Sequence, residues 1–224
     1  GSISVNSGAA YTTNASVTLS LSASDALSGV FQMRFSNDNS SWSGWEAYST
    51  SKAWTLSAGD GSKTVYVQYS DNAGNISTSF SDGITLDSTA PTGNISINGG
   101  AVYATSTSVT LSLSASDGLS GVTQMQFSND NLTWSTWEAY ATSKSWTLPA
   151  GDGSKTVYAR FRDAAGNISD LYQDSILLDV EAPTGSILIN AGAVGTNQVD
   201  VTLTLSAADP GSGVLSMRFS NDGS

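Results

Sequence analysis

The sequence contains no cysteine and no histidine among its 224 residues. The missing cysteine excludes disulfide scaffolds and thiolate metal sites, and the missing histidine removes the most common general base and transition-metal ligand. No apolar run approaches the roughly 20 residues that a membrane-spanning helix needs. Acidic residues recur singly in loops without a base, nucleophile or metal cluster beside them. We therefore expect no enzymatic activity, no membrane insertion and no obligatory cofactor.

Basic residues are also scarce. The chain has 8 Lys and Arg against 19 Asp and Glu, which gives a formal net charge of −11. Nucleic acids and anionic membrane surfaces are bound through Lys and Arg, so neither is an expected partner. The acidic residues are spread along the chain rather than gathered in a tail. They serve either to keep a long surface soluble or to bind Ca²⁺.

What the sequence does contain is an internal repeat. The segment GSISVNSGAAY at Gly1 recurs as GNISINGGAVY at Gly93 and as GSILINAGAVG at Gly185. Three tryptophans recur at the same offset of 92 residues, without insertion or deletion: Trp42, Trp45 and Trp54 become Trp134, Trp137 and Trp146. We predict repeats over 1–91 and 92–183, and an incomplete third repeat over 184–224 that holds only the first three strands. Because Gly1 already falls inside a repeat, we expect the chain to be a fragment or a processed segment.

Each repeat has the pattern of a β-sandwich. Apolar and polar residues alternate with period two in segments such as 16–22, and Gly, Asn and Asp clusters separate the segments. The predicted strands of the first repeat lie near 2–6, 16–22, 30–36, 42–48, 52–56, 63–70 and 82–87. Seven strands in 92 residues predict an all-β chain of tandem Ig-like or fibronectin-III-like sandwiches, arranged as beads on a string.

The segment TLSAGDGSKTVYVQYSDNAGNIS resembles the E-to-G portion of bacterial fibronectin-III and Ig-like repeats. The matching residues are Leu56, Gly59, Tyr66, Asp71, Gly74, Asn75 and Ser77. The connector DSTAPT over 87–92 is similar to the connectors of large bacterial surface proteins built from such repeats. The resemblance implies an extracellular or cell-surface location, and it implies that Tyr66 closes the corner of the sandwich.

The connectors 87–92 and 179–184 are short and contain proline, so they restrict bending between neighbouring repeats. The incomplete third repeat allows two interpretations. Either the chain continues beyond Ser224, or a neighbouring identical chain supplies the missing strands by β-augmentation, which would make this a polymerising filament subunit.

The motif SNDNSSW over 36–42 recurs as SNDNLTW over 128–134. It is similar to the Asp-box hairpin, in which an aspartate caps a tight turn, and we interpret it as structural. Asn39 and Asn131 occupy the position where glycine is usual, so we expect positive φ there.

Four residues form a candidate calcium site. In an Ig-type topology the B–C and F–G loops lie at the pole where the chain enters the module. That placement brings Asp117 of the B–C loop together with Asp163 and Asn167 of the F–G loop, next to Asp87 in the incoming connector. Ca²⁺ prefers such oxygen ligands. The alternative is ordinary turn chemistry, in which Asp and Asn cap their own loops.

The predicted function is that of a structural repeat segment, which gives length and rigidity to a bacterial stalk, adhesin or fibre. Its partners would be neighbouring Ig-like repeats or identical chains. The alternative functions are a repeated carbohydrate-binding array and the filament subunit completed by strand donation. A glycan platform would use the aromatic residues, although Trp42 and Trp45 are expected to face opposite sides of one strand.

Overall fold

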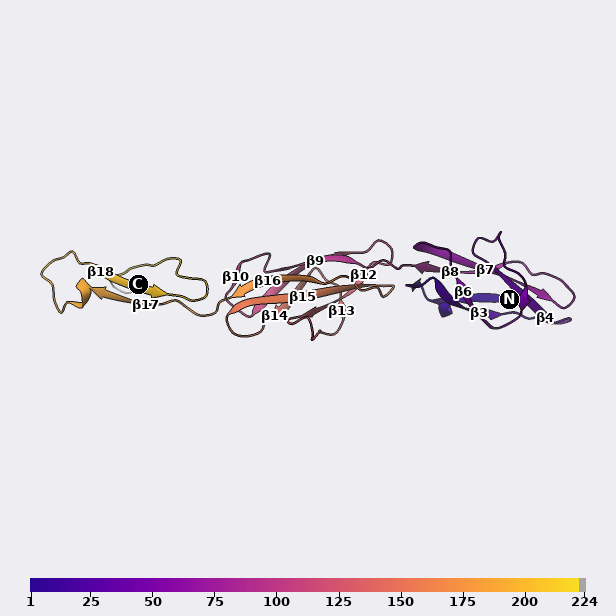
Figure 1. Ribbon diagram of the computed structural model, residues 1–224, viewed down its shortest axis with the longest axis horizontal. Helices are drawn as coiled ribbons and strands as arrows, with labels where there is room; N and C mark the ends of the chain where they lie inside the picture. Colours follow the sequence, from indigo (N-terminus) through magenta and orange to yellow (C-terminus); the bar gives the residue numbers. More distant parts are fainter. Residues whose placement is uncertain (222–224) are drawn as a thin grey trace.

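A computed structural model describes residues 1–221, so Asp222, Gly223 and Ser224 of the predicted third repeat lie outside the described residues. The chain forms a rod in which the modules follow one another along a single axis (Figure 1). The first two modules each contain a three-stranded and a five-stranded sheet, and the third contains a two-stranded sheet. In residues 1–221 no helix is long and apolar enough to cross a bilayer.

The first module is a sandwich of eight strands. The strands of the three-stranded sheet, in spatial order, are β1 (Ser2–Val5), β3 (Ser16–Ser22) and β6 (Ser51–Thr55). The strands of the five-stranded sheet are β2 (Tyr11–Thr12), β8 (Phe80–Leu86), β7 (Gly61–Asp71), β4 (Val30–Ser36) and β5 (Glu46–Ala47). Strand β2 runs parallel to β8, and the other pairs are antiparallel. This is the ABE and A′GFCC′ order of an Ig-like sandwich.

The second module repeats this arrangement. Its three-stranded sheet contains β14 (Ser143–Thr147), β11 (Ser108–Ser116) and β9 (Thr92–Ile97). Its five-stranded sheet contains β10 (Tyr103–Ala104), β16 (Tyr172–Leu178), β15 (Gly153–Asp163), β12 (Val122–Ser128) and β13 (Glu138–Ala139). The prediction of tandem all-β sandwiches is confirmed.

The alternating pattern of the sequence accounts for the core. In β3 the odd-numbered side chains of Val17, Leu19 and Leu21 are buried and the intervening ones are exposed. The facing sheet contributes side chains such as Phe35 and Val67, which are almost fully buried. Period-two alternation therefore places one face of each strand between the sheets.

Polar side chains join the two sheets at their open edges. The Asp82 carboxylate on β8 accepts a hydrogen bond from the Val5 backbone N–H at 2.7 Å. The Tyr69 hydroxyl donates to the Ser2 carbonyl at 2.7 Å, and the Tyr48 hydroxyl accepts from the Ala23 N–H. Tyr69 and Tyr48 thus tie the five-stranded side of the sandwich to the backbone of the three-stranded side.

Two strand predictions need correction. The strand predicted over 42–48 is reduced to Glu46–Ala47, because 41–45 form a loop that carries the two tryptophans. The third module was expected to hold three strands, but within 1–221 it has two, β17 (Thr184–Ile189) and β18 (Leu203–Ala208). The expected third strand corresponds to β4 and β12, which pair with β7 and β15. The described part of the third module offers no such partner.

Candidate cation site at the junction between modules

The connector after β8 leads directly into the pole of the second module. Its first residue, Asp87, donates its backbone N–H to the Thr12 carbonyl at 2.9 Å, which continues the pairing of β2 with β8. The Asp87 side chain is fully buried, and Pro91 is buried as well. Asp60 of the first module accepts hydrogen bonds from Ser88, so the start of the connector is fixed to the first module.

The second module holds Asp87 through two of its loops. The Asp87 carboxylate accepts a hydrogen bond from the Ser120 N–H of the B–C loop at 3.1 Å. The Asp87 carbonyl accepts one from the Asn167 side-chain amide of the F–G loop at 2.9 Å. Both contacts bridge the two modules. The junction is therefore a specific polar joint rather than a loose linker.

Three carboxylates meet at this joint. One oxygen each from Asp87, Asp117 and Asp163 can be chosen so that all three lie within 4.8 Å of one another. Asp87 is fully buried, Asp163 is 3% exposed and Asp117 is half-buried. The structure thus brings together the three acids that the sequence analysis placed at this pole.

Asn167 is also at the joint, but it contributes a donor. Its side-chain amide nitrogen donates to Asp163 at 2.7 Å as well as to Asp87. Its backbone N–H and that of Gly166 both donate to the other Asp163 oxygen. The asparagine therefore positions the Asp163 carboxylate relative to the backbone of Asp87.

The B–C loop favours the charged form of its aspartate. Asp117 accepts hydrogen bonds from the backbone N–H groups of Leu119, Ser120 and Gly121 at 2.8 to 3.1 Å. Partial burial is the largest single influence on the Asp117 pKa and raises it, but these N–H donors together outweigh it. The pKa of Asp117 consequently lies below its ordinary value.

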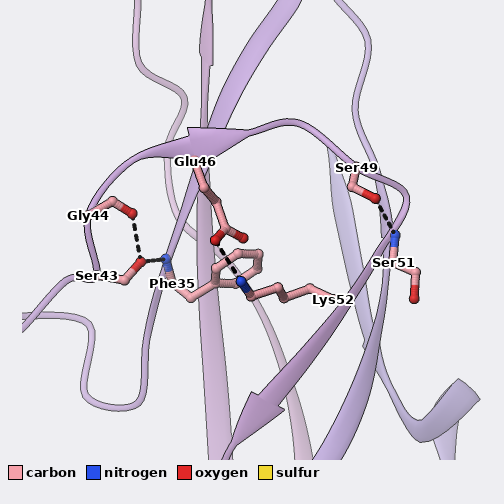
Figure 2. A network of polar contacts seen from close by, with 7 residues as sticks. All are labelled: Phe35, Ser43, Gly44, Glu46, Ser49, Ser51 and Lys52. Carbon is pink, nitrogen blue, oxygen red and sulfur yellow. Dashed lines mark hydrogen bonds and ion pairs between the residues drawn. The ribbon is translucent and has the colours of Figure 1, made fainter.

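No basic side chain balances these charges in the part of the chain that the structure describes. The two ion pairs found there join Lys52 to Glu46 and Lys144 to Glu138, each at 2.6 Å. Figure 2 shows the first of these pairs, in which Glu46 on β5 reaches Lys52 on β6 across the edge of the sandwich. Both pairs lie within single modules, so the junction carboxylates are left without a counter-charge. A divalent cation fits such a site chemically.

The second junction has part of the same arrangement. Ser212 N–H donates to both Asp179 and Asp209, which are the counterparts of Asp87 and Asp117. Asp179 is 6% exposed, and one of its carboxylate oxygens is buried without a hydrogen-bond partner. Pro183 is exposed here, whereas its counterpart Pro91 is buried. The residues 184–221 include no counterpart of the F–G loop that completes the first joint.

The tryptophans do not lie as predicted. The Arg34 guanidinium lies 5.0 Å from the Trp42 ring centroid and 4.6 Å from that of Trp45, so both rings reach the same side of the sheet. The expectation of opposite sides was wrong because these residues lie in a loop, where strand periodicity does not apply. Trp54 instead packs on Phe35 of the core and donates its indole N–H to Asn37.

The second module stacks its tryptophans on different arginines. Arg160 lies over Trp134 and Arg162 over Trp137. These arginine contacts were missed from the sequence, although one signal was present. In the first repeat Arg34 lies opposite Gln68 on the neighbouring strand. At the equivalent positions of the second repeat the two residue types are exchanged, so that Gln126 lies opposite Arg160.

The Asp-box hairpins have the expected geometry. Asp38 accepts hydrogen bonds from the N–H groups of Ser40 and Ser41 at 2.8 and 2.7 Å, and Asp130 does the same in the second module. Asn39 has φ of 59° and Asn131 has φ of 58°, so the prediction of positive φ is confirmed. In each module these residues close a tight turn.

No family model matches the chain, and no curated protein matches it by sequence. Solved structures with a similar arrangement include fibronectin(III)-like modules of CbhA from Clostridium thermocellum, at 14% identity over 79% of this chain and 92% of that chain, with a TM-score of 0.47. A tetra-tandem repeat from the extending region of a large adhesion protein is 19% identical over 92% of this chain and 55% of that chain, with a TM-score of 0.30. The FN1–FN3 domains of chicken CNTN1 are 13% identical over 78% of this chain and 65% of that chain, with a TM-score of 0.43. By its own sheet order, the chain is a tandem array of Ig-like or fibronectin-III-like β-sandwich repeats.

Proposed function

We propose that the chain is a non-catalytic structural segment of a bacterial extracellular stalk, adhesin or fibre, and that Ca²⁺ bound at its module junctions stiffens it. The observation that carries the proposal is the burial of Asp87 between two modules, beside Asp117 and Asp163. A connector that only tethers two domains does not need to bury a carboxylate in the second domain, and burying a charge costs free energy unless it is compensated.

Electrostatics supports a cation at this joint. Two carboxylates that are almost fully buried, Asp87 and Asp163, lie beside a third without a basic partner in residues 1–221. Burying unpaired charge is costly, and like charges at this distance repel each other. Ca²⁺ would remove both costs, with the three carboxylates as ligands and Asn167 holding Asp87 and Asp163 in place.

The expected gain is in stiffness more than in stability. Extracellular modules commonly bind Ca²⁺ with dissociation constants of about 10⁻⁴ to 10⁻³ M. At millimolar calcium and the tighter limit, binding stabilises the folded state by about 1.4 kcal/mol per site. The cation would instead restrict bending, because Asp87 belongs to the connector whereas Asp117 and Asp163 belong to the next module.

The test is small-angle scattering and thermal unfolding of the full chain with millimolar CaCl₂ and with chelator. Calcium should give a longer, narrower particle and a higher melting temperature. The Asp117→Asn variant should lose both responses. Asp25→Asn is the matched control, because Asp25 holds the same loop position on the first module, away from the junction, and should respond like the original chain.

Two results would contradict the proposal. Identical scattering with calcium and with chelator would remove calcium from the junction and leave stiffness to the proline-containing connector. A particle that bends freely under both conditions would overturn the role of the chain as a rod.

The strand-donation alternative has one observation in its favour. Apolar side chains of the third module, including Ile187, Leu188 and Ile189 on β17, are half exposed. A filament completed by strand exchange would bury them. Sedimentation of the full chain over a wide concentration range tests this, because a filament subunit would form polymers and a simple stalk segment would not.

The carbohydrate alternative receives less support from the structure. Trp42 and Trp45 both lie against Arg34, and Trp54 packs on the core. Stacking on a sugar requires an open aromatic face, and these contacts already engage the tryptophan rings.

A further inference from the structure

The pole of the first module offers a hollow at the place where the second module holds Asp87. The hollow has a volume of about 220 Å³, and its lining includes Asp25, Asp71, Asn75 and Ile76. At the offset of the repeat, these residues correspond to Asp117, Asp163, Asn167 and Ile168 of the occupied pole. The first pole thus carries the same residue types that surround Asp87 at the second pole.

The loops around this hollow are already set in the form that binds a connector. Ser28 and Gly29 donate their N–H groups to Asp25 at 2.8 and 2.9 Å, as Ser120 and Gly121 do to Asp117 at 2.9 and 2.8 Å. The receiving loop therefore keeps one geometry at both poles.

The F–G loop is equally conserved in shape between the two poles. Asn75 donates to Asp71 from its backbone at 2.8 Å and from its side chain at 2.7 Å. Asn167 makes the same two bonds to Asp163, at 2.8 and 2.7 Å. The loop needs no connector to adopt this form.

The exposure of equivalent residues differs between the two poles. Leu27 is 99% exposed, whereas its counterpart Leu119 at the junction is 47% exposed. Asp71 is half-buried, whereas Asp163 is buried. The first pole therefore presents an apolar side chain beside polar groups that hold an aspartate at the second pole.

We infer that the pole of the first module is a preformed socket for an acidic connector of the Asp-x-x-Ala-Pro type, presented by another module. The aspartate carboxylate of the connector accepts a hydrogen bond from Ser28 N–H, and its carbonyl accepts one from the Asn75 side chain. Leu27 is covered in the process. The occupant is defined by the first junction, where Asp87 makes these bonds to Ser120 and Asn167.

The negative charge of the socket should make docking depend on calcium. Asp25 and Asp71 are acidic, and so is the connector that they receive, so docking brings three carboxylates together as at the first junction. This part of the inference rests on the proposed calcium site. We expect docking to be tighter in calcium than in chelator.

The test places a second copy of residues 84–92 directly before Gly1 of the full chain, which sets the connector at the spacing that it has before Gly93. A tethered segment has a high effective concentration, so weak docking is detectable. In NMR spectra, the Ser28 amide and the Asn75 side-chain amide should shift toward the positions of Ser120 and Asn167. A second extension with alanine in place of the grafted aspartate is the matched control, because alanine removes the side-chain acceptor for the Ser28 N–H and keeps the backbone carbonyl that accepts from Asn75.

The outcomes separate this inference from the calcium proposal. A shift at Ser28 that requires the grafted aspartate side chain, together with a shift at Asn75, supports the socket, whether or not calcium is present. Calcium-dependent shifts at Ser120 and Gly121 without any shift at Ser28 and Asn75 would overturn the socket while retaining the calcium site. An equal shift of the Ser28 amide with the alanine extension would also overturn it, because the aspartate side chain would then play no part.

Discussion

Arg34 on β4 lies directly opposite Gln68 on β7, and its Nε and Nη2 donate to the Gln68 side-chain oxygen at 2.9 and 2.6 Å. The bonded guanidinium lies between Trp42 and Trp45. The glutamine thus holds the arginine where two aromatic rings can stack on it, and this polar pair orders the loop between β4 and β5.

The Arg34→Gln substitution should destabilise the first module by about 1–2 kcal/mol. It removes two cation–π contacts, each worth about 0.5–1 kcal/mol at exposed sites, together with the bonds to Gln68. Denaturant unfolding measures the loss, and near-ultraviolet circular dichroism reports the disordering of Trp42 and Trp45.

The double variant Arg34→Gln, Gln68→Arg is the control for this prediction. It reproduces one of the two stacks of the second module, in which Gln126 lies opposite Arg160 and Arg160 stacks on Trp134. We expect it to recover about half of the lost stability, because the stack of Arg162 on Trp137 has no counterpart in this variant. A double variant as unstable as the single one would show that the position of the arginine matters more than its presence.

The Asp-box hairpins should make the modules sensitive to acid. The backbone N–H groups of Ser41 and Ser40, followed by the Ser36 hydroxyl, hold the pKa of Asp38 well below its ordinary value, and the equivalent donors do the same for Asp130. An aspartate in the unfolded chain titrates near about 3.9. Because the folded pKa is the lower one, the stabilisation is complete above the unfolded pKa and is lost as pH falls toward the folded pKa.

Denaturation midpoints across the acidic range test this effect. The double variant Asp38→Asn, Asp130→Asn should lose less stability than the original chain as the pH falls below about 4, because asparagine accepts hydrogen bonds without titrating. If both proteins lose stability equally, the acid sensitivity arises from other carboxylates.

The first module should be more sensitive to alkali than the second. Burial, and secondarily the neighbouring Tyr48, raises the pKa of Tyr69 to about 12. An unfolded tyrosine titrates near about 10. The folded state therefore gains stability from Tyr69 below about pH 10, and this gain is lost as pH rises through the folded pKa. The second module has Phe161 at this position and lacks the effect.

The Tyr69→Phe variant tests this prediction by giving the first module the residue of the second. It should cost about 0.5–1.5 kcal/mol at neutral pH through loss of the hydrogen bond to Ser2, yet reduce the loss of stability between pH 10 and 12. Phenolate absorbance during alkaline titration measures the late-titrating group directly. The Tyr66→Phe variant should leave that late phase in place.

The Gly93→Ala substitution should destabilise the second module by about 1–3 kcal/mol, because the added methyl group overpacks the core. A Cβ at Gly93 would lie 2.6 Å from Phe161 Cδ2, still closer to Phe161 Cε2, and 3.0 Å from the Ser114 carbonyl oxygen. Phe161 is fully buried and cannot move aside easily. Gly118→Ala is the control in the same module, since a Cβ there meets nothing within 4 Å and the first module has Ala26 at that position. Thermal unfolding compares the two.

The acidic residues of the junction could be predicted from the sequence because the repeat length and the alternation indicate an Ig-like strand order. Once a unit of 92 residues with alternating strands is identified, an Ig-like order places the B–C and F–G loops beside the incoming connector. Asp87, Asp117 and Asp163 could then be grouped although they lie far apart along the chain. Alternation alone also located strands such as β3 and β4, because a half-buried strand must show period two.

The sequence by itself determined the repeat, the all-β sandwich and the grouping of the junction acids, since these follow from local alternation and a constant offset. Only the tertiary structure decided which side the tryptophans face, which tyrosines bond the backbone, and that Asn167 donates to Asp87. Loop residues such as Trp42 and Trp45 follow no period, so their direction depends on what packs against them. Side chains such as Arg34 and Gln68 come within hydrogen-bond distance only because β4 pairs with β7, and this pairing is a property of the tertiary structure.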